Sequence, residues 1–255
     1  MSIHIHKTGL NKTLGQQSDE VFSTDLIGNF DPTQGVIAAT SWTNQAASNA
    51  LRPFNSITHI TNPLPKAWEF DGTDDYLGEA SSGYGGTPFQ VAFQNAYTIG
   101  QWVYLPSSWG SGKTHILFYF YEDSGNYVMF QIENNVMEIH SYTSSGNLAN
   151  AAFTSPNLAT NKSKWLYHTI SHNGSGRYTY HINGMFMSDL STQAPTATQK
   201  PMTVGRYGSS YTSADVKVGH IHVHSSELAS SQIRQNFLEI YDNSEFRLYG
   251  ESVLV

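Results

Sequence analysis

Alternating apolar and polar residues, interrupted by frequent turn signals, run through most of this chain, and a helical period appears only near its end. Residues 96–105 (AYTIGQWVYL) carry apolar side chains on both alternating sets, which predicts a strand covered on both faces. Asn-Gly pairs at 173–174 and 183–184 predict hairpin turns, because both central residues of a type I′ turn need a positive φ. Further strands are predicted at residues 26–32, 35–42, 57–60, 115–121, 126–132, 136–140, 165–171, 177–183, 185–190, 202–206 and 215–224.

One stretch, residues 67–78 (AWEFDGTDDYLG), is expected to form a compact hairpin around which the other strands are laid. Its turn signal is Asp71-Gly72, since glycine adopts a positive φ without a steric penalty. The helical period covers residues 228–241, with Ser230 or Ser231 as the N-cap. About a dozen short strands and one late helix predict an all-β, antiparallel two-sheet jelly-roll sandwich with one short C-terminal helix.

A single domain is expected for the 255 residues, because β-sandwiches of roughly 200–250 residues are common. Residues 25–255 would form this domain. Residues 1–24 are polar and without a sustained period, so they predict an N-terminal arm. This arm is either a loosely attached tail or a segment that docks on a neighbouring subunit.

Composition restricts the partners. The net charge is −7 and the 13 Lys and Arg residues are scattered, which argues against nucleic acid and against anionic membranes. Cysteine is absent, which excludes disulfides and cysteine-based zinc sites. No signal-peptide core and no run of 18 apolar residues is present, so we expect a protein made in the cytoplasm without membrane insertion. Only 13% of residues are charged, and such an uncharged polar surface is typical of extracellular or particle-bound proteins.

Several segments, in order, resemble those of the concanavalin A-like (laminin G-like) jelly-roll family. They are residues 70–77 (FDGTDDYL), 97–103 (YTIGQWV), 165–170 (WLYHTI) with 180–184 (YHING), and 218–224 (VGHIHVH) with 228–233 (LASSQI). Upstream, residues 27–32 (IGNFDP) and 41–44 (SWTN) resemble the lead-in of phage-encoded members. The likeness spans roughly residues 25–241 and implies a scaffold that hosts many functions.

The carboxylates suggest calcium more than catalysis. Glycosidases of this family resemble one another in an acidic strand motif that holds two carboxylates about 5 Å apart, and nothing in this chain matches it. Glu133 and Glu138 are five residues apart, which we expect to place them on opposite faces across a turn. Asp71, Asp74 and Asp75 are candidates for a calcium site of the kind that the family resemblance implies at the sandwich edge. Alternatively they are turn and solvent-facing residues.

Three histidines alternate along one predicted strand. His220, His222 and His224 are expected to emerge from one face at steps of roughly 7 Å. Two such imidazoles are candidates for a Zn²⁺ or Ni²⁺ site, and the alternative is a simple polar strand face.

Aromatic residues in predicted loops are candidates for stacking on sugar rings. They are Trp109, Tyr84, Tyr207 and Tyr211, and the alternatives are loop packing or subunit contacts. The glycine-rich segments lack the context of a phosphate-binding loop, so no nucleotide is expected.

The function expected first is a non-enzymatic structural or interaction protein, a phage virion component such as a capsid decoration, tail or fibre protein. Its partners would be other virion subunits, in a homo-oligomer, and its location the virion. The alternative is a lectin-like module that binds a cell-surface glycan. A third hypothesis, a glycan hydrolase or lyase, lacks identified catalytic residues. No cofactor is expected except calcium.

Overall fold

The computed structural model describes residues 25–37, 40–62, 65–78, 94–110, 112–123, 126–143, 146–154, 157–192, 202–207, 211–212 and 215–243. Strands dominate these residues and build two sheets, with one α-helix, α1 (Ser230–Asn243), and one 3₁₀ turn, η1 (Leu158–Thr160). The predicted arm, residues 1–24, lies outside the described residues.

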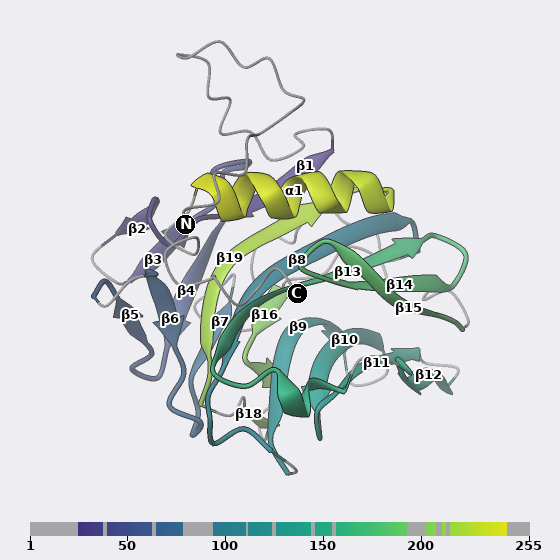
Figure 1. Cartoon of the computed structure of the whole chain (residues 1–255), viewed down its shortest axis with the longest axis horizontal. Coiled ribbons are helices and arrows are strands. Elements are labelled where there is room, and N and C mark those ends of the chain that lie inside the picture. Colours follow the sequence, from purple (N-terminus) through teal and green to yellow (C-terminus); the bar gives the residue numbers. More distant parts are fainter. Residues whose placement is uncertain are drawn as a thin grey trace, which may run out of the picture.

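Two antiparallel sheets face each other, and α1 lies across the outside of one of them (Figure 1). The sheet under the helix, called sheet I here, contains in spatial order β15 (Met185–Ser191), β14 (Arg177–Ile182), β13 (Lys164–Asn173), β8 (Ala96–Leu105), β19 (Lys217–His224), β6 (Ala67–Glu69) and β5 (Thr58–Ile60), with β1 (Leu26–Phe30) also paired to β19. The predicted two-sheet jelly-roll fold is confirmed.

Sheet II contains β12 (Gly146–Ala152), β11 (Val136–Thr143), β10 (Asn126–Glu133), β9 (Thr114–Asp123), β16 (Met202–Val204), β7 (Tyr76–Gly78), β4 (Ala50–Phe54), β3 (Ser41–Thr43) and β2 (Val36–Ile37). A separate ribbon pairs β17 (Arg206–Tyr207) with β18 (Tyr211–Thr212). The sequence pattern missed β12, because its run of Ala, Asn and Gly lacks the apolar alternation of a strand.

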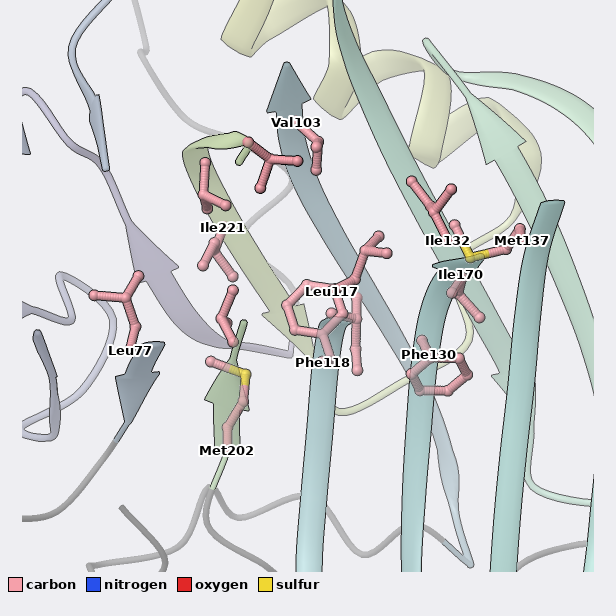
Figure 2. Close-up of a cluster of buried hydrophobic side chains, with 14 of the residues drawn as sticks. Leu77, Val103, Leu117, Phe118, Phe130, Ile132, Met137, Ile170, Met202 and Ile221 are labelled. Atoms are coloured by element: carbon pink, nitrogen blue, oxygen red, sulfur yellow. The ribbon is translucent and has the colours of Figure 1, made fainter. Parts of the chain in front are cut away.

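The core fills the space between the sheets (Figure 2). Sheet I contributes Val103, Ile170 and Ile221, and sheet II contributes Phe130 and Ile132 among others. On the other face of sheet I, Phe237 of α1 packs near Trp102 of β8, with ring centroids 5.7 Å apart. Both faces of β8 are therefore covered, as its apolar pattern predicts.

The stretch at residues 67–78 is not a hairpin, contrary to the prediction. β6 belongs to sheet I, where it pairs with β19 and β5, whereas β7 belongs to sheet II, where it pairs with β16 and β4. The six residues between them cross from one sheet to the other, anchored by a hydrogen bond from the Phe70 amide to the Val216 carbonyl. The Asp71-Gly72 turn signal could not distinguish a hairpin from a change of sheet, because such a turn occurs in both.

Other local predictions vary in outcome. At Asn183-Gly184 both residues have positive φ, 53° and 72°, as a type I′ hairpin requires. The Asn173-Gly174 turn is longer, because β13 ends at Asn173 and β14 begins only at Arg177. Helix α1 begins at Ser230, so Ala229 precedes the helix and neither Ser230 nor Ser231 is the N-cap, contrary to the prediction. Its first turn is instead closed by the Gln232 side chain, which accepts from the Ala229 amide at 2.8 Å.

No helix in the described part of the chain is long and apolar enough to cross a membrane.

Candidate functional site

A pocket of about 270 Å³, called the loop-end pocket here, opens at the end of the sandwich where β6 and β8 end and β19 begins. The crossing segment at residues 70–75 forms part of its wall. Apolar atoms come from Phe70, Pro106 and Val216, so the pocket is not purely polar. Its complete lining is Ser56, Thr58, Glu69, Phe70, Asp71, Asp75, Pro106, Asp215, Val216 and Lys217.

Asp75 is the most unusual group in this wall. It is only 3% exposed, and its Oδ2 accepts a hydrogen bond from the Asp71 amide at 2.9 Å. Its other oxygen, Oδ1, is buried and has no hydrogen-bond partner among the described residues. Burial, reinforced by the neighbouring charges of Asp71 and Asp74 and opposed by the Asp71 amide, raises the pKa of Asp75 to about 6.

Around Asp75 the acids outnumber the bases. Lys217 Nζ lies 3.1 Å from Glu69 Oε1, and Lys113 Nζ lies 3.4 Å from Asp215 Oδ1. Each lysine is thus matched by an acid of its own, which leaves the negative charges of Asp71 and Asp75 without a basic partner among the described ion pairs. The pocket therefore suits O–H donors, N–H donors and cations, and it disfavours anions.

Carboxylate oxygens of Asp71, Asp74 and Asp75 lie within 4.8 Å of one another, so the three predicted calcium ligands do converge. Asp71 Oδ1 also accepts from the Thr73 amide at 2.7 Å, which is the local turn bond of the alternative interpretation. Oxygen donors of this kind fit a hard cation such as Ca²⁺. The geometry supports both interpretations, and calcium binding stays a prediction.

Residues 73–234 match the model of the family described as the concanavalin A-like lectin/glucanases superfamily, of laminin G type. The chain belongs to this superfamily. The match covers more than half of the sequence and includes strands of both sheets, from β7 to β19, and the start of α1. A comparison with curated protein sequences found no match.

Solved structures that are similar to this chain include binding domains of toxins. The binding domain of Paraclostridial mosquitocidal protein 1 is 12% identical, with a TM-score of 0.64 over 86% of this chain and 53% of that chain. The binding domain of botulinum neurotoxin DC appears in complex with SialylT (14% identity, TM-score 0.61, 84% and 50% covered). It also appears in complex with rat synaptotagmin II (13%, 0.64, 84% and 51%). This superfamily member spans about half the length of those chains, and the low identity shows a shared fold alone.

The three histidines predicted as metal candidates are buried, and metal binding by them stays a prediction. His220, His222 and His224 are 9%, 0% and 1% exposed, so they make no solvent-facing strand face. The rings of His220 and His222 lie 4.2 Å apart, but the ligating atoms of the three histidines do not all lie within 4.8 Å of one another. His220 Nε2 lies 2.6 Å from Asn29 Oδ1 and His222 Nδ1 lies 3.2 Å from the Tyr167 hydroxyl. Strand β1 and the residues packed on the outer face of sheet I bury these histidines. The sequence pattern could not show this burial.

Trp109 is 1% exposed and belongs to the core, which corrects its assignment as a glycan-stacking residue. Its amide donates to the Pro106 carbonyl at 3.0 Å, and this tight turn directs the ring inward. Tyr84 lies outside the described residues. Tyr207 and Tyr211 form the β17–β18 pair through their backbones, and their side chains are not described.

The expectation that Glu133 and Glu138 lie on opposite faces is wrong. In the β10–β11 hairpin Glu133 pairs with Val136, so these two residues share a face, and Glu138 is two residues beyond Val136 on that same face. The prediction counted residues straight through the two-residue turn, and that count assigns Glu138 to the wrong face of the sheet. Gln131 Nε2 lies 2.7 Å from Glu133 Oε2 and 3.1 Å from Glu138 Oε2.

Sequence reasoning also missed Glu69, Asp215 and Lys217, which complete the pocket from strand ends distant in sequence. The one local signal for these three residues was that each carries a charge near the end of a predicted strand. Charged residues are common at strand ends, so this signal does not identify a pocket.

Proposed function

We propose that this chain is a carbohydrate-binding module that accepts a neutral glycan in the loop-end pocket. The observation that carries the proposal is a pocket lined by the acids Asp71, Asp75 and Asp215 together with apolar residues. Sugar hydroxyls donate to carboxylates while their C–H faces contact apolar atoms. The excess of acids would repel sialylated or sulfated sugars. No bond-cleaving step is proposed.

A glycan array probed with the labelled full chain tests this proposal. We expect binding to neutral glycans, little binding to their sialylated counterparts, and a loss of roughly tenfold or more in affinity for Asp75→Asn and Asp71→Asn, which alter acceptors in the pocket. Asp189→Asn is the matched control, because Asp189 pairs with Arg177 outside the pocket lining. Binding confined to anionic glycans, or equal binding by all variants, would contradict the proposal.

Calcium binding at Asp71, Asp74 and Asp75 is a separate proposal for the same wall. Millimolar calcium should raise the Tm of the wild-type chain, because an ion bound only by the folded state stabilises it. The rise should disappear in Asp74→Asn. An unchanged wild-type midpoint would rule the site out.

A role as a virion subunit is the second candidate, and one observation favours it. Met185 and Phe186 are 43% and 50% exposed on β15, one of the two edge strands of sheet I among the described residues. Exposed apolar residues on an unpaired edge are typical of an assembly contact. Light scattering of the purified chain should show an oligomer that Phe186→Ser weakens. Mass spectrometry of purified virions should detect the protein. A monomer at all concentrations would argue against this role.

A further inference from the structure

The outer face of the β10–β11 hairpin carries a second group of ligating side chains that shares no residue with the loop-end pocket. Gln131 and Glu133 lie on β10, and Glu138 and His140 lie on β11. Gln131 is directly opposite Glu138 in the ladder, and the other two residues are each two positions farther along. Intervening residues such as Ile132 and Ile139 face the core, so this four-residue block faces away from it.

The ligating atoms converge. One atom each from Glu133, Glu138 and His140 lies within 4.8 Å of the others. His140 Nε2 is 3.2 Å from Glu138 Oε2. Because metal–ligand distances at zinc are about 2.0–2.2 Å, two ligands of a tetrahedral zinc ion are separated by roughly 3.3–3.6 Å. The observed separation is thus close to that of a formed site.

Three possible acceptors crowd around the single side-chain nitrogen of Gln131. Gln131 Nε2 has two hydrogens but approaches three acceptors, Glu133 Oε2 at 2.7 Å and both Glu138 Oε2 and His140 Nε2 at 3.1 Å. His140 Nε2 must carry a proton to bond Glu138, yet it must present a lone pair to accept from Gln131. One nitrogen does not do both. A cation in place of the amide would be attractive to all three acceptors.

The charges of Glu133 and Glu138 also favour a bound cation. Within the described part of the chain, neither Glu133 nor Glu138 forms an ion pair with a lysine or arginine. The side chains of His140 and Glu138 are 20% and 22% exposed, so two carboxylates lie close together in a partly desolvated position. Such a pair gains stability from a bound cation, and the remaining exposure leaves an entry path.

We propose that Glu133, Glu138 and His140 bind a divalent transition metal, with Zn²⁺ as the first choice. An imidazole nitrogen beside two carboxylates favours zinc and its neighbours over calcium or magnesium, which take oxygen ligands. The Gln131 amide turns aside when the ion enters. Three protein ligands leave one position open for water or for a donor from a partner. The proposal does not depend on glycan binding.

The test is calorimetric titration of Zn²⁺ into the full chain after treatment with a chelator. We expect one zinc ion per chain, a rise in Tm on binding, and affinities reduced roughly tenfold or more in Glu138→Gln and His140→Gln. Glu133→Gln provides a third variant in case one of these unfolds, and far-UV circular dichroism without zinc verifies the fold of each.

Two controls separate this site from other zinc ligands. Glu227→Gln changes an exposed acid away from the hairpin and should leave zinc binding unchanged. His4 and His6 lie outside the described residues, and the double variant His4→Gln/His6→Gln should also bind zinc normally. Absence of zinc binding by the wild-type chain would overturn the proposal. So would full affinity in both Glu138→Gln and His140→Gln, or loss of binding in the double variant.

Discussion

Gly184 shows how tightly a single position can be constrained in this fold. It occupies the turn between β14 and β15 with φ of 72°, and helix α1 passes directly over it. A Cβ at this position would lie 2.8 Å from Arg234 Cα and 3.2 Å from Phe237 Cβ. The Arg234 side chain also donates to the Asn183 carbonyl at 2.7 Å, so the helix and the turn are fixed to each other.

Gly184→Ala should therefore lower the free energy of unfolding by about 2–4 kcal/mol, which combines backbone strain with a steric clash. Gly112→Ala is the matched control, because Gly112 has φ of 80° but no described atom within 4 Å of the added methyl group. It should cost only about 1 kcal/mol from the backbone. Urea denaturation of both variants measures the difference, and equal losses would show that the contact with α1 is unimportant.

Residue identity alone did not predict which candidates reach solvent. Trp109 follows a proline and two serines, a composition typical of an exposed loop, yet its ring is buried. Asp75 belongs to a group of acids that would ordinarily be solvated, yet it is 3% exposed. Asp75 shares its pocket wall with residues 215–217, a segment far away in the sequence. The local pattern therefore supplied the candidate residues but not their environments.

At the level of elements, helix α1 contributes more than its length suggests. Phe237 is fully buried, with its ring centroid 5.7 Å from that of Trp102 and 6.4 Å from that of Tyr167. These rings close the outer face of sheet I. The apolar face of the helix was predictable from its spacing, because Ile233, Phe237 and Ile240 recur at helical intervals and are all buried.

Phe237→Ala should destabilise the fold by about 3–5 kcal/mol, because it removes a large buried ring and leaves a cavity. Leu238→Ala, at the adjacent residue that is 38% exposed, should cost less than about 1 kcal/mol. Thermal and urea unfolding of the two variants test this contrast. Similar losses would mean that α1 is not anchored through Phe237.

Strand pairing was predictable where two strands meet through a tight turn, as in β14–β15. It was not predictable at β6 and β7, where the chain changes sheets between two neighbouring strands. The same limit affected Glu133 and Glu138, because facing across a hairpin depends on the turn register and not on sequence separation.

Across the described part of the molecule, seven histidines are buried. Burial lowers the pKa of His115 and of His168 to about 3, and it lowers the pKa of His222 well below its ordinary value. The folded state thus holds these rings neutral, whereas the unfolded chain protonates them near pH 6.5. Their contribution to stability is fully present above pH 6.5 and is lost as the pH falls toward about 3.

The free energy of unfolding should therefore decrease as the pH falls from 6.5 to 4, by up to about 1.4 kcal/mol per pH unit for each such histidine. Asp75 acts in the opposite direction, because its raised pKa favours the folded state at lower pH. Urea titrations at several pH values measure the sum, and His168→Gln should make the slope shallower. A stability that does not change over this range would show that the rings are not held neutral.

The pairing of β1 with β19 places the start of β1 at the end of β19 that lies away from the pocket. Leu26 is opposite His224, whereas Lys217, at the other end of the same strand, lines the pocket. Seven residue steps of β19 separate the two ends, a span of about 23 Å. A tether attached at the β1 end would therefore point the pocket outward, toward whatever approaches the surface to which the protein is fixed.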